Sequence, residues 1–310
     1  MKVLVAGATG LAGSAILNCF KSNGYEVYGI GRKEVDLLNR DHTFEFVKKL
    51  KPDLIVDAAA KVGGIVANDT FPVEFLADNL RIQNNLIEAA HNSDIERFIF
   101  LGSSCIYPRD CKQPIKEEYL LTGPLEPTNS AYAIAKIAGI ELINSFRKQY
   151  GRKWISLMPT NLYGPRDNFN LVGSHVLPAL VRKFVEAKNM NLTEQVLWGS
   201  GSPTREFLHV DDLANAVFYF HDKYDSNIHL NIGSGRETSI KELSEIVASA
   251  TGFQGEIKWD KSKPDGTPRK VLDSTVANNL GWKARIALED GIQSTVEWFR
   301  GEILKGGARI

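Results

Sequence analysis

The sequence has little of what marks several classes of protein at first sight. Only three cysteines occur in 310 residues, Cys19, Cys105 and Cys111, too few and too irregularly spaced for a disulfide framework or a tetrahedral zinc site. No run of about 18 apolar residues exists, and no basic segment followed by an apolar stretch opens the chain. We therefore expect a soluble, cytoplasmic protein with no membrane partner and no metal site.

A surplus of charge of one sign is also missing. The 37 Lys and Arg residues equal the 37 Asp and Glu residues, so the formal net charge is zero. Such a chain has no overall electrostatic field that would attract nucleic acid, and we predict no nucleic-acid partner. Any anionic ligand must be held by a few cations placed locally.

What is present is an ordinary globular composition with an alternating pattern. Hydrophobic residues make up 43% of the chain, as in compact proteins, and the length suggests about two domains. Short apolar strands alternate with helical segments over the first hundred residues, which predicts a parallel sheet with helices on its faces. The predicted strands are residues 2–6, 26–30, 54–57 and 97–101, and two of the predicted helices cover 42–50 and 72–92.

The alternation becomes irregular after Pro165. We therefore predict an α/β protein with a Rossmann-type doubly wound parallel sheet and a smaller, interleaved C-terminal α+β substrate domain. The dinucleotide-binding domain would cover residues 1–165, with returns near 206–232, and the substrate-binding domain residues 166–205 and 233–310. Ligands of such sheets lie beyond the carboxyl ends of the strands.

A glycine-rich loop follows the first predicted strand and precedes a helical pattern. Its glycines, Gly7, Gly10 and Gly13, are spaced G-x-x-G-x-x-G. In this setting glycines allow a tight turn and a close approach to a pyrophosphate, while the helix N-terminus presents free N–H groups to the anion. A lone glycine triplet is a weak signal, but the strand–loop–helix setting makes it a strong one. The predicted dinucleotide contacts here are Gly7, Thr9, Gly10, Leu11, Ala12 and Gly13.

The end of the second strand indicates which dinucleotide is bound. An NAD site usually carries an Asp or Glu at this point to hold the ribose 2′-hydroxyl, whereas here Arg32 and Lys33 follow Gly31. Two cations suit a 2′-phosphate, so the sequence predicts NADP(H) with Arg32 on the phosphate. The alternative is that both are solvated loop charges.

A tyrosine and a lysine four residues apart form the predicted chemical centre. Tyr132 and Lys136 would share one face of a helix, which Thr128, Asn129 or Ser130 could each cap. A neighbouring ammonium favours phenolate, so we expect Lys136 to lower the pKa of Tyr132 from about 10. Ser103, at a strand end, could bond the same substrate oxygen as hydride arrives. The alternative, for an isolated pair of this kind, is a packed aromatic ring beside a snorkelling lysine.

These residues belong to a larger set of motifs by which the chain resembles the extended short-chain dehydrogenase/reductase family over essentially its whole length. Several of the motifs are shared among the sugar-nucleotide reductases, epimerases and dehydratases of that family. The discriminating part is Ser103-Ser104-Cys105 with the downstream Ser174-His175-Val176. The other motifs are residues 126–129, 132–136, 158–165, 198–201, 205–212 and 263–270.

The resemblance implies an activity on GDP-4-keto-6-deoxy-D-mannose: inversion of C3 and C5, followed by NADPH-dependent reduction of the C4 ketone. It makes Tyr132 the proton donor at C4, with Lys136 on the nicotinamide ribose and Ser103 orienting the ketone. Cys105 becomes the base and His175 the acid of the inversions. Read alone, Cys105 would be a small buried hydrophobe and His175 an ordinary residue at a helix start.

The resemblance also implies further contacts. Those to NADP(H) are Ala59, Leu101, Gly102, Lys136, Pro159, Asn161, Leu162 and His175. Those to the GDP-sugar are Ser104, Asn161, Lys183, Trp198, Arg205, Asp265 and Arg269. The helices carrying residues 75–90 and 132–146 are the faces through which this family commonly dimerises, so a homodimer is expected.

Three alternative functions remain open. The first is another sugar-nucleotide reductase of this family, and the second is a 4-epimerase, which would recycle its cofactor. The third is an NADP-sensing protein without catalysis, against which the intact set of Ser103, Tyr132 and Lys136 argues. A dehydratase of this fold should carry an acidic pair where Ser104 and Cys105 stand.

Overall fold

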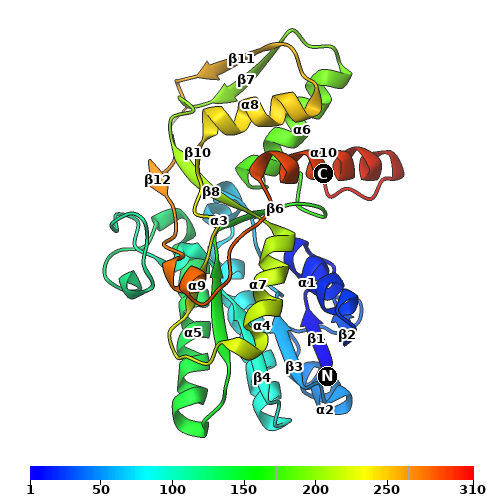
Figure 1. The fold of residues 1–310 in the computed structure, drawn as a ribbon, viewed down its shortest axis with the longest axis vertical. Coiled ribbons are helices and arrows are strands. Elements are labelled where there is room, and N and C mark those ends of the chain that lie inside the picture. The colour runs from blue at the N-terminus through cyan, green and yellow to red at the C-terminus, as the bar shows by residue number, and fades with distance from the viewer. Residues whose placement is uncertain (172, 264) are drawn as a thin grey trace.

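The computed structural model describes residues 1–171, 173–263 and 265–310, and its main feature is a six-stranded sheet (Figure 1). The strand order is β2-β1-β3-β4-β5-β9, and every neighbouring pair is parallel. The strands are β1 (Lys2–Ala6), β2 (Glu26–Ile30), β3 (Leu54–Asp57), β4 (Arg97–Leu101), β5 (Ile155–Pro159) and β9 (Leu230–Ile232).

Helices cover both faces of this sheet. Alternate side chains of a strand point to opposite faces, and accordingly Val3 and Val5 of β1 join one core cluster while Leu4 and Ala6 join the other. The first cluster includes α1 (Leu11–Ser22) and α7 (Val210–Lys223). The second includes α2 (Arg40–Leu50), α4 (Pro72–Asn92) and α5 (Ser130–Tyr150). The predicted doubly wound parallel sheet is confirmed.

A second layer system occupies the upper part of the molecule in Figure 1. Its apolar core joins three helices, α6 (Val176–Asn189), α8 (Ile240–Thr251) and α10 (Leu288–Lys305). One sheet there contains β6 (Asn161–Tyr163), β8 (Thr204–His209), β10 (Glu237–Ser239) and β12 (Arg269–Lys270). A separate pair joins β7 (Glu194–Trp198) to β11 (Glu256–Asp260).

Two short helices complete the chain, α3 (Ile65–Thr70) and α9 (Thr275–Asn279). Figure 1 places α3 at the level where the upper and lower parts of the molecule meet. Among the described residues, no helix is both long enough and apolar enough to cross a bilayer.

The carboxyl ends of three strands bring the predicted site together. Strands β3, β4 and β5 are neighbours and parallel, so Asp57, Leu101 and Pro159 end at one edge of the sheet. After β4 the chain passes Gly102 and Ser103 and enters a 3-10 turn, Ser104–Ile106. Helix α5 begins with Tyr132 in its first turn and packs against β4 and this turn. Residues distant in sequence therefore meet beyond the sheet, as the topology requires.

Candidate active site

The glycine loop has the geometry of an anion cradle. Gly7 has φ +76°, a conformation that favours glycine, and a Cβ there would lie 2.6 Å from the carbonyl oxygen of Ala58. A Cβ at Gly13 would collide with the carbonyl of Gly7, so α1 packs directly on the turn. The N-cap of α1 is Gly10, and no side chain caps it. The first N–H groups of the helix are thus available to a pyrophosphate.

Arg32 lies beside this cradle. A Cβ at the preceding Gly31 would touch Thr9 of the loop at 3.0 Å, which shows how closely the end of β2 approaches it. The side chains of Arg32 and Lys33 are exposed. Neither has a hydrogen-bond or ion-pair partner among the described residues, so both cations are available to a phosphate.

Lys136 is the best fixed of the predicted catalytic groups. Its side chain is 3% exposed, and its Nζ donates a 2.8 Å hydrogen bond to the carbonyl oxygen of Leu101. The same Nζ lies 4.7 Å from the ring centroid of Phe100 and 6.0 Å from that of Tyr132. Helix α5 is therefore attached to the end of β4 by this buried ammonium.

The pKa of Tyr132 differs from the sequence expectation. Burial raises it above its ordinary value, the nearby Cys105 raises it further, and hydrogen bonding to Ser103 opposes both. The expected net lowering of this pKa is wrong for this structure, because the loss of water around the buried phenol disfavours the phenolate. Tyr132 is thus a protonated phenol at neutral pH, which is the form a proton donor must have.

Asp57 is a site residue that the sequence analysis missed. It is fully buried, its Oδ1 accepts a 3.1 Å hydrogen bond from the N–H of Ala59, and its Oδ2 has no partner. Burial raises the pKa of Asp57 to about 6, opposed by the charge of Lys136. Burial likewise lowers the pKa of Lys136 to about 8, opposed by Asp57. The only signal in the sequence was a carboxylate on the last residue of a strand.

Cys105 lies within a polar environment. Its Sγ accepts from Nδ2 of Asn129 at 3.5 Å and from Nζ of Lys270 at 3.9 Å. Asn129 occupies the N-cap position of α5, yet its side chain makes no cap bond. Of the three predicted caps, Thr128 and Ser130 bond back to Glu126 and Pro127, and Asn129 serves the thiol.

Lys270 is the second site residue that the sequence analysis missed. The sequence predicts a role for the neighbouring Arg269, whose side chain points the other way. Residues 269 and 270 form the short strand β12, so their side chains point to opposite faces. Arg269 is ion-paired with Glu237 of β10, its Nε lying 2.9 Å from the carboxylate. Lys270 turns to Cys105 instead. The motif alone could not show which of the two cations faces the thiol.

His175 stands at the N-cap position of α6 and is open to solvent on one side. The protein around the ring lowers its pKa by desolvation, and the charge of Lys270 lowers it further. Its ring has no hydrogen-bond partner among the described residues. Lys270 therefore influences both predicted groups of the inversion, Cys105 and His175.

Three predicted substrate residues in the upper part of the molecule form a second group: Trp198 at the end of β7, Lys183 on α6, and Asp265. Trp198 is 68% exposed, and the Nζ atoms of Lys183 and Lys263 lie 5.8 and 5.7 Å from its ring centroid. Asp265 accepts from the backbone N–H and the hydroxyl of Ser200 at 2.9 and 2.7 Å, just beyond Trp198. An exposed indole ring can stack on a planar nucleobase. The two ammonium groups beside it can pair with the phosphates of the same nucleotide.

Arg205 and the remaining predicted contacts lie around the ends of the strands. Arg205 is a register partner of Lys270 across β8 and β12, and burial lowers its pKa. Ser104 is buried, and the amide of Asn161 donates to the carbonyl of Glu206 at 2.8 Å. Four predicted cofactor contacts lie at the same edge of the sheet as Lys136. They are Ala59 after β3, Gly102 after β4, Pro159 at the end of β5, and Leu162 in β6.

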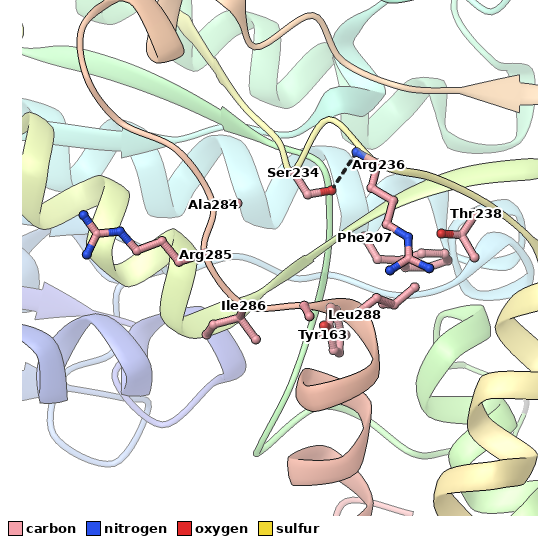
Figure 2. A pocket seen from close by; sticks show the side chains of 10 residues that line it. Tyr163, Phe207, Ser234, Arg236, Thr238, Ala284, Arg285, Ile286 and Leu288 are labelled. Atoms are coloured by element: carbon pink, nitrogen blue, oxygen red, sulfur yellow. Dashed lines mark hydrogen bonds between the residues drawn. The ribbon is translucent and has the colours of Figure 1, made fainter.

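A cavity of about 240 Å³ lies elsewhere, between β8, β10 and the start of α10 (Figure 2). Arg236, the residue before β10, lines it, but its guanidinium is ion-paired with Glu289 and Glu242. Figure 2 shows Arg285 directed away from the other labelled side chains. No predicted site residue lines this cavity, so it is separate from the group around Lys136.

Comparison with known proteins agrees with this geometry. The model of the NAD dependent epimerase/dehydratase family matches residues 3–233. The chain is 53% identical to probable GDP-L-fucose synthase 1 of Oryza sativa subsp. japonica, over 96% of this chain and 92% of that protein. It is 48% identical to GDP-L-fucose synthase of Escherichia coli (strain K12), over 96% of each.

A solved structure of a protein with a related name has the same fold. The crystal structure of a GDP-L-fucose synthetase from Naegleria fowleri bound to NADP superposes with a TM-score of 0.90 at 31% identity, covering 100% of this chain and 96% of that one. The chain belongs to the NAD-dependent epimerase/dehydratase family of extended short-chain dehydrogenases/reductases, and within that family it groups with the GDP-L-fucose synthases.

Proposed function

We propose that this chain converts GDP-4-keto-6-deoxy-D-mannose to GDP-L-fucose by inverting C3 and C5 and then reducing C4 at the expense of NADPH. The observation that carries the proposal is the placement of Cys105 beside the reductase pair Tyr132 and Lys136, with Asn129 and Lys270 both donating to its sulfur. A reductase that left the ring carbons untouched would have no use for a second proton-transfer group there. The relatives named GDP-L-fucose synthase support the same conclusion.

The cradle and its cations fit NADP(H). The Gly7–Gly13 turn and the uncapped start of α1 would hold the pyrophosphate, and Arg32 the 2′-phosphate. Lys136 and the residues at the ends of β3, β4 and β5, with Asn161, Leu162 and His175, would hold the nicotinamide half. When bound, NADPH supplies the hydride that reduces C4.

For the reduction, Tyr132 donates its phenolic proton to the C4 oxygen as negative charge develops there. Ser103 donates a second hydrogen bond to the same oxygen and fixes its position. The Lys136 ammonium stabilises the phenolate that remains, since it is held between Leu101, Phe100 and the Tyr132 ring. Its own charge is maintained by Asp57.

For the inversions, Cys105 removes the protons next to the C4 ketone. Tyr132 and Ser103 stabilise the enolate by the same hydrogen bonds that serve the reduction. The Nζ of Lys270 and the amide of Asn129 donate to the Sγ of Cys105 and fix the position of the sulfur. His175 delivers a different proton to the opposite face of the same ring carbon, while the proton removed stays on Cys105 until it exchanges with solvent. The lowered pKa of His175 makes the imidazolium a stronger acid.

The GDP portion would lie along the upper sheets. Trp198 offers a face for the guanine, and Lys183, Arg205 and Arg269 offer cations for the diphosphate. Asp265, fixed by Ser200, is an acceptor for donors of the nucleoside. Ser104 and Asn161 lie nearer the sugar. The sugar nucleotide would bind between the two predicted domains. One comprises residues 1–165 with the return near 206–232, and the other residues 166–205 and 233–310.

We also propose a homodimer in the cytoplasm. Helices α4 and α5 pack against each other and carry exposed apolar side chains such as Val73, 72% exposed, and Ile134, 49% exposed. A second copy that covered these faces would remove that surface from water.

Replacing the thiol separates the two halves of the reaction. In Cys105→Ser, deuterium uptake from D2O at C3 and C5 should fall by at least about 100-fold, because a hydroxyl is essentially un-ionised near neutral pH, whereas an ordinary thiol is a few per cent thiolate and so supplies a base. NADPH affinity should persist. NMR of the recovered sugar measures the exchange, and Cys111→Ser, a free cysteine outside the site, is the control. Undiminished exchange in Cys105→Ser would remove this residue from the mechanism.

The buried carboxylate sets the alkaline limit of hydride transfer. The pKa of Lys136 is about 8, so the rate should fall as pH rises through that value and the ammonium is lost. In Asp57→Asn the opposing charge is gone while burial remains, so the fall should begin at a pH lower by about one unit or more. Asp53→Asn, at the exposed residue just before β3, should leave the profile unchanged. A wild-type profile in Asp57→Asn contradicts the role given to Asp57.

Arg32 should determine cofactor choice. Arg32→Asp places a carboxylate where the 2′-phosphate would lie, so the KM for NADPH should rise about 10-fold or more while that for NADH changes little. Steady-state rates with both cofactors measure this, and Lys48→Asp, with the same charge change on α2, controls for net charge. If the preference for NADPH survived in Arg32→Asp, another cation must hold the phosphate.

A further inference from the structure

A pair of glycines after β3 contacts the segment that precedes His175. The N–H of Gly64 donates a 2.9 Å hydrogen bond to the carbonyl oxygen of Gly173. A Cβ at Gly64 would lie 2.5 Å from the carbonyl oxygen of Ser174. Gly64 has φ −68°, which any residue adopts, so its backbone conformation does not require glycine. Glycine is required at this position because the two chain segments approach each other so closely.

Both sides of this contact are held in place. The buried amide of Asn68 donates to the carbonyl oxygens of Gly63 and Gly64 at 2.8 and 3.0 Å. On the opposite side, the N–H of Gly173 donates to Oδ1 of Asn170 at 2.8 Å, and the N–H of Ser174 to the carbonyl of Asn170 at 3.1 Å. These bonds fix the shape of each segment, and the contact through Gly64 sets the distance between the two segments.

His175 depends on this contact for its position. It is the next residue after Ser174, and its ring has no hydrogen-bond partner among the described residues to hold it. Only the backbone of residues 173–175 and the start of α6 fix where the imidazole begins. A shift of that backbone moves the ring directly.

We propose that Gly64 is a positioning residue: its contact with Gly173 and Ser174 places the imidazole of His175 for proton delivery to the sugar ring. This rests on the proposed function, in which His175 is the acid of the inversions. Gly64 itself touches no substrate. It acts because a hydrogen in place of a side chain lets the β3–α3 loop reach the segment that carries His175.

The test is Gly64→Ala, with Gly173→Ala as the matched control. The added Cβ of Gly64→Ala forces the segments apart by about 0.5–1 Å, whereas a Cβ at Gly173 meets nothing closer than Oδ1 of Asn170 at 3.6 Å. Two rates are measured at saturation: deuterium uptake at C3 and C5 without NADPH, and oxidation of GDP-L-fucose at C4 by NADP⁺. The second rate needs hydride transfer and no inversion.

Gly64→Ala should lose about 10–100-fold in deuterium uptake while the oxidation rate stays within about threefold, because a displacement of this size is enough to disable a proton transfer. Gly173→Ala should keep both rates. A general structural defect would lower both rates together, and that result would overturn the proposal. So would deuterium uptake in Gly64→Ala equal to that of Gly173→Ala.

Asn68→Ala provides a second test if Gly64→Ala does not fold. It removes the two hydrogen bonds that hold the glycine loop and adds no bulk, so it should show the same selective loss in deuterium uptake, to a smaller degree. Equal effects on both rates contradict the proposal. If the wild-type chain shows neither rate, the proposed function fails; if it shows both and the variants show no selective loss, only the role of Gly64 fails.

Discussion

The site depends on one buried ammonium. Lys136 donates to the last carbonyl of β4 and lies against Phe100, in a place where a lone charge would be costly. Asp57, at the end of the adjacent strand, provides the opposing charge without a direct partner for its own Oδ2. This arrangement attaches α5 to the sheet and brings Tyr132 to the point where the strands end. The other side chains of the proposed mechanism lie around that fixed group.

The local part of this arrangement could be predicted from the sequence. The glycine loop, the strand-end Ser103 and the Tyr132–Lys136 spacing are each encoded within a few residues, and the alternation of strands and helices determines that their elements meet at one edge. The doubly wound parallel sheet follows from the same pattern and is confirmed. The individual roles of the site residues, by contrast, stay predictions until they are measured.

The long-range part could not be predicted in this way. Lys270 reaches Cys105 from 165 positions away, because β12 pairs with β8 in a register that turns Arg269 to Glu237. Asn129 lies at a helix start, where its side chain would ordinarily be expected to cap the helix, but its amide donates to the Sγ of Cys105 instead. The pKa of Tyr132 depends on how much water the folded chain excludes, which spacing does not reveal. Each of these depends on tertiary packing.

The chain has no net charge, but the structure places individual cations at particular points of the candidate site. Cations occur where an anion or a proton transfer needs one: Arg32 beside the glycine cradle, Lys183 at Trp198 and Lys270 at Cys105. In the proposed mechanism, inversion and reduction share the C4 oxygen and its two donors, so one site can serve both reactions. In that mechanism the inversions need, beyond the groups that serve the reduction, only Cys105 and His175 around the same ketone.

The most direct test is to incubate the chain with GDP-4-keto-6-deoxy-D-mannose and NADPH in D2O and to analyse the product by NMR. The account predicts consumption of one NADPH per sugar and GDP-L-fucose carrying deuterium at C3 and C5. A product reduced at C4 with its original C3 and C5 configuration, or no loss of NADPH absorbance, would contradict it.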